Sequence, residues 1–237
     1  MNKTTQLKKL LLQRKALPCP GVYDALSARM VEYCGFQACQ ISGFGVSASS
    51  LGMTDASFTS LEEIVRITSN IVRAVDIPVM TDADTGYGNA VNVWWTTKRL
   101  EETGAAGMNL EDQCFPKRCG HMAGKQLISL GEMVGKIRAA VDAKRDPDFV
   151  INARTDAAYV CGIEEAIRRG NAYLEAGADM VFVESPASAE EVKRAIEQIK
   201  GPVSINMLEG GRTPMLTFEE LRQLGAARVS CPMFTSL

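Results

Sequence analysis

The sequence predicts an α/β fold, specifically a (β/α)8 TIM barrel, and three observations support this prediction. Short apolar runs recur about eight times, amphipathic stretches of helical length lie between them, and no low-complexity linker interrupts the series. The 237 residues also suit such a barrel, which needs at least about 200 residues and typically has about 250. A doubly wound sheet fits the same alternation, but we favour the barrel.

The expected strands form two groups. Four are simple apolar runs at 17–22, 78–81, 149–153 and 203–207, and four follow a glycine within 35–42, 104–111, 177–184 and 225–232. In the second group, a glycine just past a helix supplies a left-handed cap, and the next residues enter a buried strand. The chain stops soon after the last strand, so we expect the C-terminal helices to be missing from it.

The expected helices carry start signals and apolar faces. Apolar residues between Leu61 and Val75 recur at spacings near one helical turn. Four helices open with a Ser or Thr followed three residues later by Glu, at 60/63, 129/132, 188/191 and 217/220. We expect an N-terminal helix in 1–15, barrel strands and helices in 16–237, and a single domain over 1–237.

Composition and charge exclude several functional classes. The 26 Lys and Arg against 28 Asp and Glu give a formal net charge of −2, which does not favour a nucleic-acid partner. No apolar run approaches the roughly 20 residues that cross a bilayer, and the N-terminus lacks a signal-peptide core. The 7 cysteines form no C-x-x-C pair, which favours free thiols. We therefore expect a cytoplasmic protein without nucleic-acid or membrane partners.

Polar residues gather where the expected strands end. The carboxyl ends of parallel barrel strands meet on one face, where catalytic groups lie. Buried charges are costly unless they are paired or bound to metal, so core packing does not explain this pattern. The residues are Ser42, Gly43, Asp82, Asp84, Glu111, Asp112, Arg154, Asp156, Glu184 and Asn206.

Four acidic residues of this face predict a metal site. Asp82 and Asp84 lie two apart on a chain expected to be extended, so both should point to the same side. With Asp55 and Glu111 they would form a cluster of oxygens that repel one another. A hard divalent cation relieves this repulsion, so we expect Mg²⁺, with Mn²⁺ as a possible substitute.

A loop after the strand ending at Glu111 contains the sequence Lys117-Arg118-Cys119-Gly120-His121. Basic side chains on both sides should lower the pKa of the Cys119 thiol from its usual value of about 8.5. A polarised thiol above a metal site could donate a proton or act as a nucleophile.

A glycine-rich segment follows the strand at 203–207. Gly210, Gly211 and Thr213 offer backbone N–H groups to an anion, either a phosphate or a carboxylate. Other chemistries have less support. No expected strand ends in a Lys for a Schiff base, and no G-x-S-x-G motif is present for a serine hydrolase.

Together these motifs resemble the isocitrate lyase/phosphoenolpyruvate mutase superfamily over nearly the whole chain. The resemblance rests on segments 42–47, 81–88, 109–113, 117–121 and 153–157. The Cys-Gly-His loop is the most specific of them and looks like the lyase side, which includes 2-methylisocitrate and 2,3-dimethylmalate lyases. Phe44 and the segment 209–214 look more like the dimethylmalate lyase and oxaloacetate hydrolase branch.

The resemblance implies a role for each site residue. It implies Asp55, Asp82, Asp84 and Glu111 around Mg²⁺, and Cys119, Arg154 and Glu111 as catalytic residues. It also implies a set of substrate-binding residues: Ser42, Gly43, Phe44, Gly120, His121, Arg154, Glu184, Asn206, Gly210, Gly211 and Thr213.

The activity implied is a Mg²⁺-dependent retro-Claisen cleavage of a small carboxylic acid. A 2-alkylmalate or (methyl)isocitrate-type hydroxy acid would give an α-keto acid and a carboxylic acid. Oxaloacetate hydrolase or decarboxylase activity, phosphoenolpyruvate or phosphonopyruvate mutase activity, and a non-enzymatic dicarboxylate-binding barrel remain alternatives. The resemblance further implies a homo-oligomer, a tetramer of swapped dimers.

Overall fold

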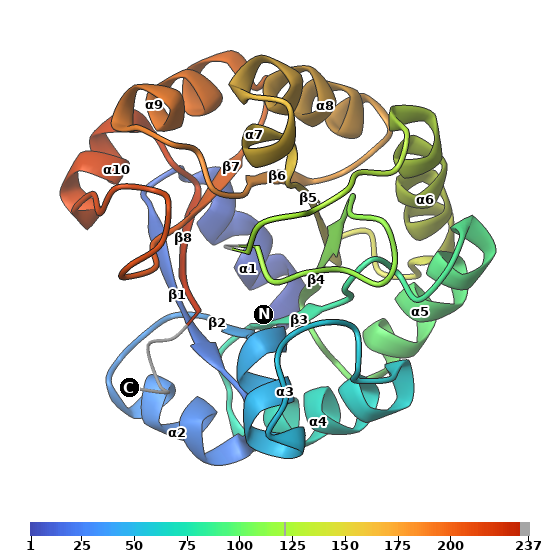
Figure 1. Cartoon of the computed structure of the whole chain (residues 1–237). Coiled ribbons are helices and arrows are strands. Elements are labelled where there is room, and N and C mark those ends of the chain that lie inside the picture. Colours follow the sequence, from blue (N-terminus) through green and yellow to red (C-terminus); the bar gives the residue numbers. More distant parts are fainter. Residues whose placement is uncertain (121, 233–237) are drawn as a thin grey trace.

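Eight parallel strands close into a barrel in the computed structural model, which describes residues 1–120 and 122–232. Each strand pairs with its sequence neighbours, and β1 pairs with β8 in the register Leu17 to Arg228. Helices surround the barrel in Figure 1. The predicted (β/α)8 barrel is therefore confirmed, and the doubly wound sheet is excluded.

The strands are short and evenly distributed. They are β1 (Leu17–Val22), β2 (Cys39–Ile41), β3 (Val79–Asp82), β4 (Gly107–Glu111), β5 (Val150–Thr155), β6 (Met180–Val183), β7 (Val203–Asn206) and β8 (Arg228–Cys231). All eight lie within or next to the predicted runs. The run at 35–42 is strand only at its end, because Gly35 has φ +84° and the next residues form the entry to β2.

Ten helices occur in the part of the chain that the structure describes. They are α1 (Lys3–Leu12), α2 (Ala25–Tyr33), α3 (Gly43–Leu51), α4 (Leu61–Ala74), α5 (Ala90–Glu102), α6 (Leu130–Ala143), α7 (Ala157–Val160), α8 (Ile163–Glu175), α9 (Ala189–Gln198) and α10 (Phe218–Leu224). No helix among these residues is long and apolar enough to cross a membrane.

The local start and stop signals agree with the helix ends. The four glycines that precede strands have φ of +84°, +84°, +106° and +85°, as expected for a left-handed cap. All four predicted Ser or Thr caps accept a bond from the N–H three residues later. The reciprocal Glu contact forms only in α4 and α10, so the full capping box is wrong for α6 and α9.

Helix α1 lies across the end of the barrel at which the strands begin. Leu7 and Leu11 are buried against residues from β1, β3, β5 and β6, and α1 is seen through the barrel in Figure 1. Thr4 Oγ1 and Thr5 Oγ1 donate to Asp146 and Asp148, at 2.7 and 2.6 Å. This arrangement closes one end and leaves the strand carboxyl ends for a site.

Candidate functional site

A pocket of about 670 Å³ lies at the carboxyl ends of the strands. Most of the predicted site residues line it: Ser42, Gly43, Phe44, Asp55, Asp82, Glu111, Cys119, Gly120, Arg154, Glu184 and Asn206. They come from α3 and its N-cap, from β3, β4, β5 and β7, from the residue just after β6, and from the loops that follow α3 and β4. The expectation that polar strand ends converge on one face is thus met.

Lys117 lies among the four predicted metal-binding carboxylates. Its Nζ is 2.9 Å from Asp55 Oδ2 and 3.1 Å from Asp84 Oδ1, and the side chain is 3% exposed. Burial alone would lower the pKa of Lys117, but the carboxylates of Asp84, Glu111, Asp82 and Asp55 raise it well above its usual range. The lysine is therefore a fixed positive charge in this cluster.

Asp84 does not lie on the extended chain that the sequence predicted, although its carboxylate still joins the acidic cluster. The strand ends at Asp82, and Asp84 has φ +53°, a left-handed conformation in which the alternation of an extended chain no longer holds. Asp82 Oδ1 instead accepts the backbone N–H of Asp84 at 2.9 Å. Asp82, Asp55 and Lys117 line both the main pocket and a small neighbouring pocket, whereas Asp84 lines only the small one.

The cluster has the chemistry of a site for a hydrated hard cation. Asp84 Oδ1 and Glu111 Oε1 are buried without a hydrogen-bond partner, and the Asp84 oxygen has only its ion pair to Lys117. Burial raises the pKa of both carboxyl groups, against the opposing effect of Lys117. Within the described residues, no three acidic or thiol side chains group closely enough to hold an ion directly. Mg²⁺ commonly keeps several waters, so the donor set fits such an ion.

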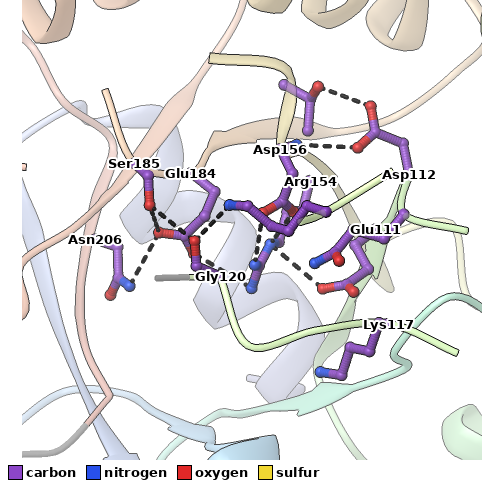
Figure 2. A network of polar contacts seen from close by, with 12 residues as sticks. Glu111, Asp112, Lys117, Gly120, Arg154, Asp156, Glu184, Ser185 and Asn206 are labelled. Atoms are coloured by element: carbon purple, nitrogen blue, oxygen red, sulfur yellow. Dashed lines mark hydrogen bonds and ion pairs between the residues drawn. The ribbon is translucent and has the colours of Figure 1, made fainter. Parts of the chain in front are cut away.

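Arg154, at the end of β5, joins three carboxylates (Figure 2). Its Nε lies 2.9 Å from Asp156 Oδ2 and 3.4 Å from Glu111 Oε2, and its Nη1 lies 3.3 Å from Glu184 Oε2. Burial would lower the pKa of Arg154, but Asp156, Glu111 and Glu184 raise it well above its usual range. The guanidinium is therefore permanently charged and held on several sides.

Asp156, which holds Arg154, is in turn held by Asp112. Asp156 N–H donates to Asp112 Oδ1 at 2.9 Å, and Thr155 Oγ1 donates to Asp112 Oδ2 at 2.7 Å. Tyr173 Oη and Arg169 Nη1 also donate to Asp112 Oδ2, at 2.7 and 3.1 Å. Through these bonds the fully buried Asp112 joins the end of β4 to β5 and α8.

Gly120 lies directly against Arg154 and Glu184. A Cβ atom there would be 2.5 Å from Arg154 Nη2 and 2.9 Å from Glu184 Cδ, closer than side chains approach one another. The Ser185 hydroxyl lies 3.1 Å from the Gly120 carbonyl oxygen. Only glycine allows this approach, which holds the neighbouring Cys119 at the pocket wall.

The N-terminus of α3 offers a site for an anion. Ser42 caps the helix, its Oγ accepting from Gly45 N–H at 3.1 Å. Ser42, Gly43 and Phe44 all line the pocket. Free N–H groups and the helix dipole at such an end favour a carboxylate or phosphate.

The remaining predicted residues lie in different places. Asn206 Nδ2 lies 3.4 Å from Glu184 Oε1 at the pocket wall. Gly210, Gly211 and Thr213 lie outside the lining of the pocket, although Thr213 is buried with its hydroxyl unpartnered. His121 lies outside the described residues.

Several residues of the site were not singled out from the sequence. Lys125 is buried on Asp156, Tyr159 stacks beside it, and Phe182, Met207 and Leu208 line the pocket. A lysine in a loop and apolar residues at strand ends resemble solvent-facing and core residues, so the sequence carries no signal for them. Asp156, the partner of Lys125, could be recognised from the sequence because it is one of the polar residues at the strand ends.

Comparison with known proteins identifies related sequences. A family model described as phosphoenolpyruvate phosphomutase matches residues 7–236. The chain is 49% identical to 2,3-dimethylmalate lyase of Eubacterium barkeri, over 95% of this chain and 78% of that protein. It is 44% identical to 2-methylisocitrate lyase of Aeropyrum pernix, over 97% and 73%.

Solved structures agree with this comparison. A structure of oxaloacetate acetylhydrolase in complex with the inhibitor 3,3-difluorooxalacetate matches with a TM-score of 0.94 and 36% identity, covering 98% of this chain and 80% of that chain. A crystal structure of 2,3-dimethylmalate lyase matches with a TM-score of 0.93 and 36% identity, covering 98% and 79%.

Proposed function

The chain belongs to the phosphoenolpyruvate phosphomutase family, within which it is a carbon–carbon lyase. We propose that it cleaves a 2,3-dialkylmalate or a similar 2-hydroxy dicarboxylic acid. One observation supports this most: Cys119 and Gly120 lie over Arg154 and Glu184, in a pocket that also contains the acidic cluster around Lys117. A proton donor, an anion site and a cation site therefore share one pocket.

Members of this superfamily generally depend on a divalent metal. We assign the metal as Mg²⁺, held partly through water by Asp55, Asp82, Asp84 and Glu111. When bound, the ion would act as a Lewis acid toward the oxygens of the α-keto acid product. Mn²⁺ is the expected substitute because it prefers the same hard oxygen ligands.

In this proposal, residues of the chain bind the two ends of the substrate. One carboxylate lies at the N-terminus of α3, on the N–H groups of Gly43 and Phe44, and Arg154 donates to the oxygens at the reacting end. Gly120, His121 and Asn206 are proposed to hold the other carboxylate. Gly210, Gly211 and Thr213 do not line the pocket in this structure, and we propose that their segment adds backbone N–H groups when substrate is bound. Glu184 orients Arg154.

Carbon–carbon cleavage then follows from the charges around the substrate. Loss of the hydroxyl proton lets the electrons of the adjacent C–C bond move onto the departing acid as an enediolate, leaving an α-keto acid. Donors already aimed at the oxygens of that departing carboxylate stabilise the developing negative charge. The thiol of Cys119 then donates its proton to the carbanion carbon, giving the carboxylic acid.

The charges of the pocket favour two carboxylates over three. Among the lining residues that the structure describes, only Lys117 and Arg154 are cationic, and Lys117 is engaged by Asp55 and Asp84. Phe44, Phe182, Met207, Leu208 and Met215 offer apolar surface instead. An alkyl substituent gains from such surface, whereas an unpaired third carboxylate would be costly to bury.

The test is proton NMR of the protein with Mg²⁺ and, separately, 2,3-dimethylmalate, 2-methylisocitrate, isocitrate and oxaloacetate. We expect pyruvate and propionate from 2,3-dimethylmalate, with turnover lost on adding a chelator and restored by Mg²⁺. Faster turnover of 2-methylisocitrate would refute the preference for two carboxylates. No turnover of any hydroxy acid by the folded protein would refute the lyase proposal.

Oxaloacetate hydrolysis is a second candidate, because the structural match to oxaloacetate acetylhydrolase is as good as that to the lyase. The same NMR experiment separates the two activities. Consumption of oxaloacetate alone, giving oxalate and acetate, would assign the chain to hydrolysis. Consumption of phosphonopyruvate, followed by phosphorus NMR, would assign it to phosphonate chemistry.

A further inference from the structure

Lys125 joins the two parts of the site that carry the reactive groups. Its Nζ donates to Asp156 Oδ1 at 2.7 Å and to the carbonyl oxygen of Gly120. Asp156 in turn holds Arg154, and Gly120 follows Cys119 in the chain. One ammonium group therefore links the thiol loop to the support of the guanidinium.

The burial of this contact makes it strong and specific. The side chains of Lys125 and Asp156 are both 0% exposed. Hydrogen bonds between charged groups are roughly twice as strong as neutral ones, and a buried ammonium that loses its partners is costly. Gly120 packs closely on Arg154 and Glu184, since a Cβ atom added there would lie 2.5 Å from Arg154 Nη2 and 2.9 Å from Glu184 Cδ (Figure 2).

Tyr159 extends this link to a third loop. The Lys125 Nζ lies 4.5 Å from the centre of the Tyr159 ring, and Arg212 Cζ lies 4.8 Å from it. Arg212 belongs to the glycine-rich segment after β7, so the loops after β4, β5 and β7 all meet at Tyr159. Cation–π attraction to the ring therefore helps to hold these loops together.

We propose that Lys125 is a positioning residue of the lyase reaction, fixing the Cys119 sulfur relative to Arg154 by holding Gly120 and Asp156 together. This inference rests on the proposed function for its kinetic consequence. Its structural consequence, the accessibility of Cys119, can be measured whether or not the protein is a lyase.

The chain offers a matched control at the opposite end of the barrel. Lys144 Nζ likewise donates to a carbonyl, Phe149 O at 3.0 Å, and to a carboxylate, Asp179 Oδ2 at 3.1 Å. Both acceptors lie near the starts of β5 and β6, where α1 closes the barrel. Lys144→Met therefore removes the same type of contact without touching the site.

The experiment compares Lys125→Met, Lys125→Arg and Lys144→Met with the unaltered protein. We measure kcat and KM with 2,3-dimethylmalate, and the rate at which iodoacetamide alkylates Cys119, by mass spectrometry of the peptide that contains it. For Lys125→Met we expect kcat to fall about tenfold or more with a smaller change in KM, and alkylation to accelerate several-fold. Lys125→Arg should restore part of both, and Lys144→Met should change neither.

Unchanged alkylation and kcat in Lys125→Met would overturn the proposal, as would equal changes in Lys144→Met. If Lys125→Met does not fold, Tyr159→Leu tests the same link, with a two- to fivefold change expected from the lost cation–π contact and none in Tyr159→Phe. If the unaltered protein turns over no acid, the proposed function fails, and the alkylation rates alone decide the role of Lys125.

Discussion

Gly120→Ala is the substitution whose effect follows most directly from the geometry. The new Cβ would lie 2.5 Å from Arg154 Nη2, about 0.9 Å inside the ordinary contact limit of 3.4 Å. Arg154 cannot yield, because Asp156, Glu111 and Glu184 hold it. The loop must therefore move outward by about 1 Å, and a displacement of that size costs roughly a hundredfold in rate.

The assay is the initial rate of keto-acid formation from 2,3-dimethylmalate, together with thermal unfolding. We expect kcat to fall about a hundredfold, while overpacking lowers the free energy of unfolding by only about 1–3 kcal/mol. Gly131→Ala is the control, because a Cβ there meets nothing within 4 Å and α6 gains a better helix former. Gly120→Ala retaining half of the activity or more would refute the argument that the loop is held against Arg154.

Three further substitutions test other parts of the site and barrel. Cys119→Ser should abolish turnover of the hydroxy acid while keto-acid binding, followed by calorimetry, persists; full activity would exclude the thiol as the proton donor. Asp112→Ala should lower the free energy of unfolding by about 3–5 kcal/mol in chemical denaturation, because Arg169 keeps only Glu165 as a partner and the buried Thr155 and Tyr173 hydroxyls lose their acceptor; a loss below 1 kcal/mol would contradict this. Arg228 is fully buried with Nη2 unpartnered, and burial lowers its pKa, so Arg228→Met should leave stability unchanged or raise it by about 1–4 kcal/mol; a marked fall in Tm would show that the charge is compensated.

The barrel and the general position of its site could be predicted because they depend on repeated local signals. Glycine caps and apolar runs recur with each strand, and parallel strands bring their carboxyl ends together whatever the details of packing. Arg154, Glu111, Glu184 and Asn206 therefore meet at the pocket as expected.

The parts that could not be predicted depend on contacts distant in sequence or on single dihedral angles. Asp84 departs from the extended conformation because its φ is positive, which the strand pattern does not reveal. Lys117 and Lys125 have the sequence context of solvent-facing loop residues, yet each is buried by carboxylates from other loops. The partners that bury them lie more than 30 residues away.

The closure of the barrel by α1 affects the order in which products depart. Leu7 and Leu11 are buried where the strands begin, so we expect the substrate and both products to pass through the face at the carboxyl ends of the strands. The product nearer this face must leave first, and the product behind it leaves last. Because the last product dissociates to give the free enzyme, it competes with incoming substrate. Product-inhibition patterns would therefore show which fragment of the cleaved acid lay deeper in the pocket.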